Sequence, residues 1–170
     1  MEHPTILPAN ETQVPLILNF IRKLAEYERL SHEVVADEET LRRSLFGTQP
    51  SAEVILAYIK GEPVGFAVYF QNFSTFSGRA GIYLEDLFVE PAHRGSGIGG
   101  ALLRYLADLG KQRGCARLNW AVLDWNRPAI DFYRSIGAVP LEDWTVFQLS
   151  GEALDRFGAS KDSSTTTQSL

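Results

Sequence analysis

The segment His93-Arg94-Gly95-Ser96-Gly97-Ile98-Gly99-Gly100 lies between an apolar stretch at residues 82–89 and a helical pattern that begins at Ile98. Backbone N–H groups at a helix start bind phosphate, aided by the positive end of the helix dipole. Glycines let the backbone approach an anion closely, and Arg94 adds a positive charge and several donors. The segment therefore predicts a phosphate-binding loop between a strand and a helix.

Two other interpretations of this loop compete with that one. Gly95, Gly97 and Gly100 also satisfy the dinucleotide fingerprint G-x-G-x-x-G, and Asp124 lies near the place of a ribose-binding acid. However, residues 90–94 separate the strand from the first glycine, the unit follows a hairpin, and no further strand–helix–strand units follow. A glycine-rich turn without a ligand is the second alternative, although several glycines at a helix start cost stability.

Outward from the loop, hydrophobic periodicity predicts alternating strands and helices. The first half of the chain should hold a strand at 5–7, a helix capped by Thr12 with Pro15 in its first turn, and a helix capped by Asp37 and ended by Gly47. Strands at 54–59 and 64–70, joined by a hairpin turn at 60–63, and a strand at 82–89 should follow. After them we expect a helix from Ile98, a strand at 117–123, a helix opened by Pro128 and ended by Gly137, and a strand at 144–149. Strands joined by hairpins are antiparallel, whereas a strand–helix–strand unit is parallel. The order predicts an α/β (α+β) fold with a mixed, mostly antiparallel central sheet and helices on both faces.

Length and composition suit a single domain at residues 1–159, followed by a polar tail at 160–170 that we expect to be disordered. The formal charge of −5 disfavours nucleic-acid binding and suits a cationic substrate. The N-terminus lacks the features of a signal peptide, and no apolar run is long enough to span a membrane. We therefore expect a cytoplasmic protein with neither nucleic acid nor membrane as a partner. The histidines show no ligand spacing, so no metal site is predicted.

The glycine loop and three other segments of the sequence resemble a known family. Arg94–Gly99 matches the R-G-x-G-I-G form of the pyrophosphate motif in the GNAT superfamily of N-acetyltransferases. The segments at 84–89, 124–133 and 25–28 resemble the spermidine/spermine acetyltransferases and their thialysine acetyltransferase relatives. The resemblance implies the GNAT fold, a homodimer, and transfer of an acetyl group from acetyl-CoA to a primary amine of a small molecule.

The resemblance also implies a CoA site. Leu87, Phe88 and Val89 would offer backbone groups to the pantetheine arm and the acetyl carbonyl. The pyrophosphate would be held by the loop residues Arg94, Gly95, Ser96, Gly97, Ile98, Gly99 and Gly100. The thioester end would be lined by Asn126, Pro128, Ala129 and Tyr133.

The acceptor amine is suggested by a departure from the polyamine enzymes. Those enzymes carry an acidic residue and a Trp between the positions of Tyr69 and Tyr83, whereas here residues 71–79 read QNFSTFSGR. Residues 75–79 and 121–126 are closer to the thialysine branch. We expect a thialysine-like or lysine-like amine or a diamine. A polyamine or protein-lysine acetyltransferase and a non-catalytic CoA-binding regulator are the alternatives.

Acetyl transfer to an amine requires two proton movements. A primary ammonium, with a pKa of about 10.4, must lose a proton before it attacks, and the departing CoA thiolate must gain one. Tyr133 is the predicted acid, because a phenol stays protonated at neutral pH and this residue occupies the family's matching position. The alternative is a core stripe that Tyr133 shares with Ala129, Phe132 and Ile136.

Four residues are candidates for the acceptor side. Glu85 and Asp86 interrupt an apolar strand, which disfavours their burial, and a bulge there could redirect one of them. Glu85 is the predicted base, acting through water, and Asp86 could attract the ammonium; a solvated strand end is the alternative. Tyr27 and Glu28 end the first helix, where a carboxylate is disfavoured by the helix dipole and a cationic substrate would offset that. A solvated surface charge is the alternative for Glu28.

Overall fold

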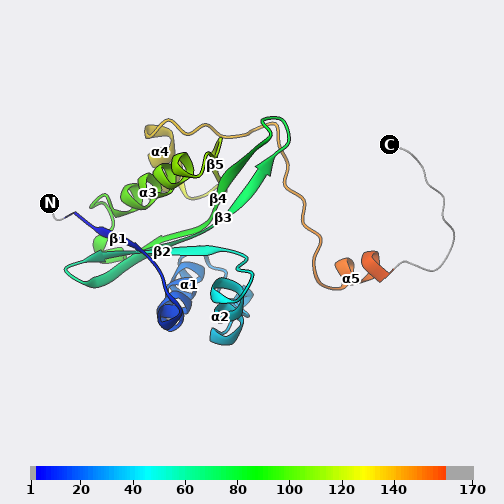
Figure 1. Cartoon of the computed structure of the whole chain (residues 1–170), viewed down its shortest axis with the longest axis horizontal. Helices are drawn as coiled ribbons and strands as arrows, with labels where there is room; N and C mark the ends of the chain where they lie inside the picture. Colours follow the sequence, from blue (N-terminus) through cyan, green and yellow to red (C-terminus); the bar gives the residue numbers. More distant parts are fainter. Residues whose placement is uncertain (1–2, 160–170) are drawn as a thin grey trace. The chain divides into compact units, whose positions relative to one another are not determined.

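The computed structural model describes residues 3–159, and these form two compact units that divide between Leu123 and Asp124 (Figure 1). The predicted polar tail at 160–170 lies outside the described residues. The glycine-rich loop belongs to the first unit, and the predicted acid Tyr133 belongs to the second.

A five-stranded sheet forms the centre of the first unit, in the order β1 (Thr5–Pro8), β2 (Glu53–Ile59), β3 (Glu62–Ser74), β4 (Arg79–Val89) and β5 (Leu118–Trp120). The pairs β1–β2, β2–β3 and β3–β4 are antiparallel, whereas β4 and β5 are parallel. The parallel pair follows from α3 (Ile98–Gln112), which returns the chain between them. The predicted mixed, mostly antiparallel sheet is confirmed.

The hairpin between β2 and β3 turns on two residues, Lys60 and Gly61, with φ of 52° and 84°. Two consecutive positive φ angles are typical of a type I′ turn, whose twist matches that of the strands it joins. The predicted hairpin is therefore confirmed, with β3 beginning at Glu62, one residue before the predicted turn ends.

Helices cover both faces of this sheet. Figure 1 shows α1 (Val14–Glu28) and α2 (Glu38–Phe46) on one face and α3 on the other. Short 3-10 turns at Glu11–Gln13, Ser31–Glu33 and Pro91–His93 lie in the connections. Asp37 caps α2 as predicted, since its carboxylate accepts from the Thr40 N–H at 2.8 Å. The predicted cap at Thr12 is wrong: the N-cap of α1 is Gln13, whose side chain makes no capping hydrogen bond, and Asn10 caps the 3-10 turn that precedes the helix. Pro15 lies in the first turn of α1 as predicted.

The core between α1 and the sheet is built on aromatic rings. Phe20 stacks on Phe66 with ring centres 5.4 Å apart and lies 5.8 Å from Phe88 of β4. The cluster is completed by Ile17, Leu24, Val54, Leu56 and Val68. Burial of each large apolar side chain contributes roughly 1.5–3 kcal/mol, so this packing holds α1 against the sheet.

The second unit begins with α4 (Arg127–Ser135) and includes α5 (Gly151–Ala159). Asn126 caps α4, because its side-chain oxygen accepts from the Ala129 N–H at 3.4 Å, and Pro128 lies in the first turn. Gly137 follows with φ of 87° and ends the helix as predicted. The predicted start and end of this helix are therefore confirmed.

Two strand predictions need correction. The strand predicted at 117–123 is only three residues long, as β5 covers Leu118–Trp120. The strand predicted at 144–149 is wrong: these residues carry no strand, and α5, which was not predicted, follows them. Their β-branched and aromatic residues favour a strand, but a strand also needs a hydrogen-bonded neighbour, and no β-pairing of the described residues reaches this segment.

Candidate active site

A bulge in β4 shapes the centre of the candidate site. Val68 of β3 pairs with Asp86, and the next residue, Tyr69, pairs with Leu84, so Glu85 is the extra residue on β4. Such a bulge bends its strand and changes which side chains face each side. The bulge that the sequence left open at the two adjacent carboxylates is thus present in the structure.

The bulge switches the faces of the strand. Before it, Ile82 Cδ1 lies 3.5 Å from the point that a Cβ would occupy on Gly110 of α3. After the bulge, Leu87 Cδ2 lies 3.7 Å from the position that a Cβ would occupy on Gly99 of α3. Side chains of even and odd residues would point to opposite faces in a regular strand. The extra residue thus lets both halves of β4 pack on α3, while Asp86 shares the α1 face with Val68 and Phe88.

The pairing of β4 with β5 covers only Ile82, Tyr83 and Leu84 among the described residues. Residues 85–89 continue beyond the last β5 partner, so the edge of β4 there is not taken up by that ladder. Backbone N–H and C=O groups on such an edge can bind an extended, amide-containing ligand. This edge includes Leu87, Phe88 and Val89, whose predicted contact with the pantetheine arm stays a prediction.

The glycine loop enters α3 through two left-handed residues, Gly95 with φ of 75° and Gly97 with φ of 87°. Gly97 is the N-cap of α3 and supplies no side-chain cap to its first N–H groups. A Cβ at either glycine would have open space around it, so backbone conformation rather than crowding calls for glycine. Ser96 Oγ donates to the His93 carbonyl at 2.5 Å and closes the loop. An anion can therefore approach these N–H groups directly.

The side chain of Arg94 contacts both β4 and α1. Its Nε donates to the Val89 carbonyl at 3.0 Å. Its Cζ lies 4.3 Å from the centre of the Tyr27 ring and 5.6 Å from that of Phe88. Tyr27, predicted to bind the acceptor, is thus in contact with a residue predicted to bind the cofactor.

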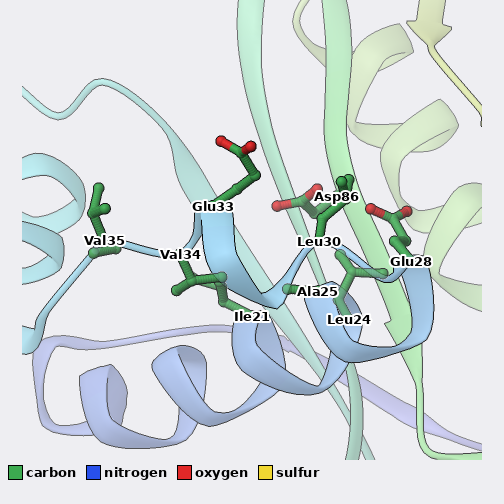
Figure 2. Close-up of a pocket in the computed structure, with 10 residues that line it drawn as sticks. Ile21, Leu24, Ala25, Glu28, Leu30, Glu33, Val34, Val35 and Asp86 are labelled. Carbon is green, nitrogen blue, oxygen red and sulfur yellow. The ribbon is translucent and has the colours of Figure 1, made fainter.

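A pocket of about 280 Å³ opens between the end of α1, the connection after it, and β4. Figure 2 shows the carboxylates of Glu28, Glu33 and Asp86 above a floor of apolar side chains in this view. The apolar lining comes from Ile21, Leu24, Ala25, Leu30, Val34, Val35 and Ala36. An aliphatic chain that ends in an ammonium group matches this combination of surfaces.

Protonation in the pocket reflects burial and crowding of like charges. Burial, with a smaller contribution from the neighbouring carboxylates of Glu85 and Glu28, raises the pKa of Asp86 to about 6. Burial also raises the pKa of Glu28. A cation placed between these carboxylates would relieve both the repulsion and the desolvation. The pocket thus favours a positively charged occupant.

The structure separates the four residues predicted for the acceptor side. Glu28 and Asp86 line the pocket, whereas Tyr27 packs on Arg94 and Glu85, the bulge residue, is exposed. Glu33 and the apolar lining of the connection after α1 also belong to the pocket and were not predicted from the sequence. The signal was present in Val34-Val35-Ala36, a short apolar run inside an otherwise polar connection.

Within the second unit, Tyr133 lies in the last half of α4, with its ring centre 5.7 Å from that of Phe132. Asn126, Pro128 and Ala129 form the start of the same helix. Their predicted contacts with the thioester end stay predictions.

Among residues 3–159 no group of His, Cys, Asp and Glu side chains is arranged to hold a metal ion. Within the same range, no helix combines the length and the apolar character needed to cross a bilayer.

The chain is similar to proteins of known name over most of its length. The sequence profile described as the acetyltransferase (GNAT) family matches residues 20–138. The chain is 42% identical over 160 residues to a thialysine N-epsilon-acetyltransferase of Bos taurus, covering 88% of this chain and 94% of that protein. It is 38% identical over 165 residues to the Mus musculus protein of the same name, covering 91% and 96%. An integron cassette protein from V. cholerae superposes with a TM-score of 0.78 at 27% identity, covering 92% of this chain and 98% of that one.

Proposed function

The chain belongs to the GNAT family of acetyltransferases and acetylates an amine with acetyl-CoA as the donor, and on this premise we propose that the amine is thialysine or a similar lysine-like compound. The observation that carries the proposal is the pocket of Glu28, Glu33 and Asp86 over an apolar floor. Its size suits a short aliphatic amine, and its carboxylates suit an ammonium group. The names of the relatives from Bos taurus and Mus musculus support the same acceptor.

In the proposed reaction, the ammonium group of the acceptor binds between Glu28 and Asp86. Its proton leaves through water to Glu85, which is exposed on the bulge. The neutral nitrogen then attacks the thioester carbon, so that an N–C bond forms and the carbonyl oxygen gains negative charge. Backbone N–H donors of Leu87, Phe88 and Val89 stabilise this oxyanion. The C–S bond breaks, and the Tyr133 hydroxyl protonates the departing thiolate. The nitrogen, which gained a positive charge when it attacked, loses its second proton to water and becomes the amide nitrogen. Tyr133 recovers a proton from solvent, and Glu85 releases to solvent the proton that it accepted.

Acetyl-CoA is proposed to lie along the edge of β4, with its pyrophosphate on the loop from Arg94 to Gly100. The positive φ of Gly95 and Gly97 and the lack of a side-chain cap on α3 support this place. Asn126, Pro128 and Ala129 are assigned to the thioester end by resemblance. We also propose a homodimer in the cytoplasm that needs no metal, nucleic acid or membrane; sedimentation equilibrium would test the dimer.

The acceptor is tested by kcat/KM for thialysine, lysine, putrescine, spermidine and spermine at one ionic strength, with release of free thiol as the signal. We expect thialysine and lysine-like amines to exceed spermine, because residues 71–79 offer no acid to distal ammonium groups. A preference for spermine that rises with each added amine would contradict the proposal. Absence of thiol release with every amine would favour a CoA-binding regulator.

The assignment of Tyr133 is tested by Tyr133→Phe, which keeps the ring and removes the hydroxyl. A general acid contributes about 10²–10⁴-fold, so kcat should fall by that factor while the KM for acetyl-CoA changes little. Single-turnover rates ensure that chemistry is being measured. An unchanged rate would contradict the role as acid and favour the alternative, in which Tyr133 is one member of a core stripe.

A further inference from the structure

Arg94 stands at the entrance to the glycine loop, yet its side chain is held by residues outside that loop. The Nε–H group of Arg94 donates a hydrogen bond to the Val89 carbonyl, and its Cζ lies 4.3 Å from the centre of the Tyr27 ring. A ring face attracts a guanidinium without using its N–H donors, and the bond to Val89 uses one of five. The remaining donors belong to the two terminal nitrogens, which are the ones suited to a phosphate.

The end of α1 meets the segment before the loop at a second point. Lys23 Nζ lies 2.5 Å from Glu90 Oε1, where β4 has just ended. Lys23 and Tyr27 are four residues apart and so lie on one side of α1. The helix therefore contacts residues 90–94 along its last two turns, and Tyr27 supplies the contact nearest the glycines.

We propose that Tyr27 is a positioning residue for acetyl-CoA, which holds Arg94 in place and thereby sets the affinity for the pyrophosphate. The inference rests on the proposed function, since it takes the loop to be the pyrophosphate site. An arginine side chain that is fixed before the ligand arrives loses less rotamer freedom on binding. Tyr27 thus acts on the donor, whereas its neighbour Glu28 acts on the acceptor.

The test compares two donors, acetyl-CoA and S-acetylpantetheine, which carries the same thioester and lacks the pyrophosphate. In Tyr27→Leu, the ratio of kcat/KM for acetyl-CoA to that for S-acetylpantetheine should fall by about 2- to 5-fold, the range for loss of an exposed cation–π contact. Tyr27→Phe keeps the ring and should keep the ratio. In an Arg94→Gln background, Tyr27→Leu should change the ratio no further.

Lys23→Met is the matched control, because it removes a second contact between α1 and this segment, the ion pair with Glu90, without changing Arg94. Lys23→Met should leave the ratio of kcat/KM for the two donors unchanged. Thermal unfolding of each variant checks that the variant is folded. An equal fall for both donors in Tyr27→Leu, or a rise only in the acceptor KM, overturns the inference. A wild-type protein that uses both donors equally overturns the pyrophosphate assignment as well, so the two failures are distinguishable.

Discussion

The glycine loop follows β4 and the acidic pocket includes Asp86 of β4, and the two would bind their proposed ligands by different means. The loop is one continuous segment, Arg94–Gly100, and it offers backbone N–H groups to an anion. The pocket collects side chains from the end of α1, from the connection after it, and from Asp86 of β4. Backbone groups are the same in every protein, whereas side chains can be exchanged one at a time. The proposed donor site would therefore depend on backbone conformation, and the proposed acceptor site on residue identity.

The two sites also have opposite electrostatics. The loop presents the uncapped N-terminus of α3 with Arg94 beside it, and the pocket holds carboxylates whose pKa values are raised. An anionic donor and a cationic acceptor are thus attracted to separate places. A substitution confined to one site should therefore change the binding or kcat/KM of one substrate and leave those of the other nearly unchanged.

Gly97→Asp should produce the largest effect. A left-handed φ costs a non-glycine residue roughly 1–3 kcal/mol, and a carboxylate near the bound anion adds about 1 kcal/mol of repulsion. Together these raise the Kd for CoA by about 100-fold, measured by calorimetry, with the acceptor KM nearly unchanged. Gly97→Ala separates strain from charge and should give about a 10-fold rise. Binding of NAD in place of CoA would contradict the donor assignment.

Asp86→Asn should lower kcat/KM for the acceptor by about 10- to 100-fold, the range for loss of a charged hydrogen-bond partner. The KM for acetyl-CoA should stay within about two-fold, since the loop is untouched. A matched loss of both substrates would mean that the two sites are not separable in the way their geometry indicates.

The same variant should be more stable than wild type above pH 6. The pKa of Asp86 is raised by burial from 3.8 to about 6, so the folded state holds a proton that the unfolded state has lost. Stability conferred by the protonated form is therefore lost as pH rises from about 4 to about 6. Asparagine stays neutral, and the variant should gain about 1–3 kcal/mol at pH 8 and little at pH 4. Thermal unfolding at both pH values measures the difference.

Glu33→Gln should have the smallest effect. Its side chain is largely exposed and lies 3.3 Å from His32, so water and salt screen its charge. We expect a fall of about 2- to 5-fold in kcat/KM for acceptors with two positive charges, and a smaller fall for monoamines. Glu39→Gln, in the first turn of α2 and outside the pocket, is the matched control. Equal losses in both variants would show a general effect of net charge.

The local structure of the glycine loop could be predicted from the sequence, whereas the grouping of residues in the pocket could not, for a physical reason. Glycines that need positive φ, the strand before them and the helical stripe after them are all local signals. Tertiary packing alone decides that Glu33 and Asp86, far apart in sequence, line one pocket. The predicted strand at 144–149 failed in the same way, because strand formation depends on a neighbour that local propensity cannot supply.

The bulge at Glu85 was anticipated from its chemistry, but its consequence concerns length. Removing this one residue would turn Leu87 and Val89 away from α3 and pull Phe88 out of the aromatic core, so a single deletion would invert half a strand. A substitution at 85 leaves this packing intact, because the side chain is exposed, although it would remove the proposed base. For the packing of β4, the spacing between Leu84 and Asp86 therefore matters more than the identity of the residue between them.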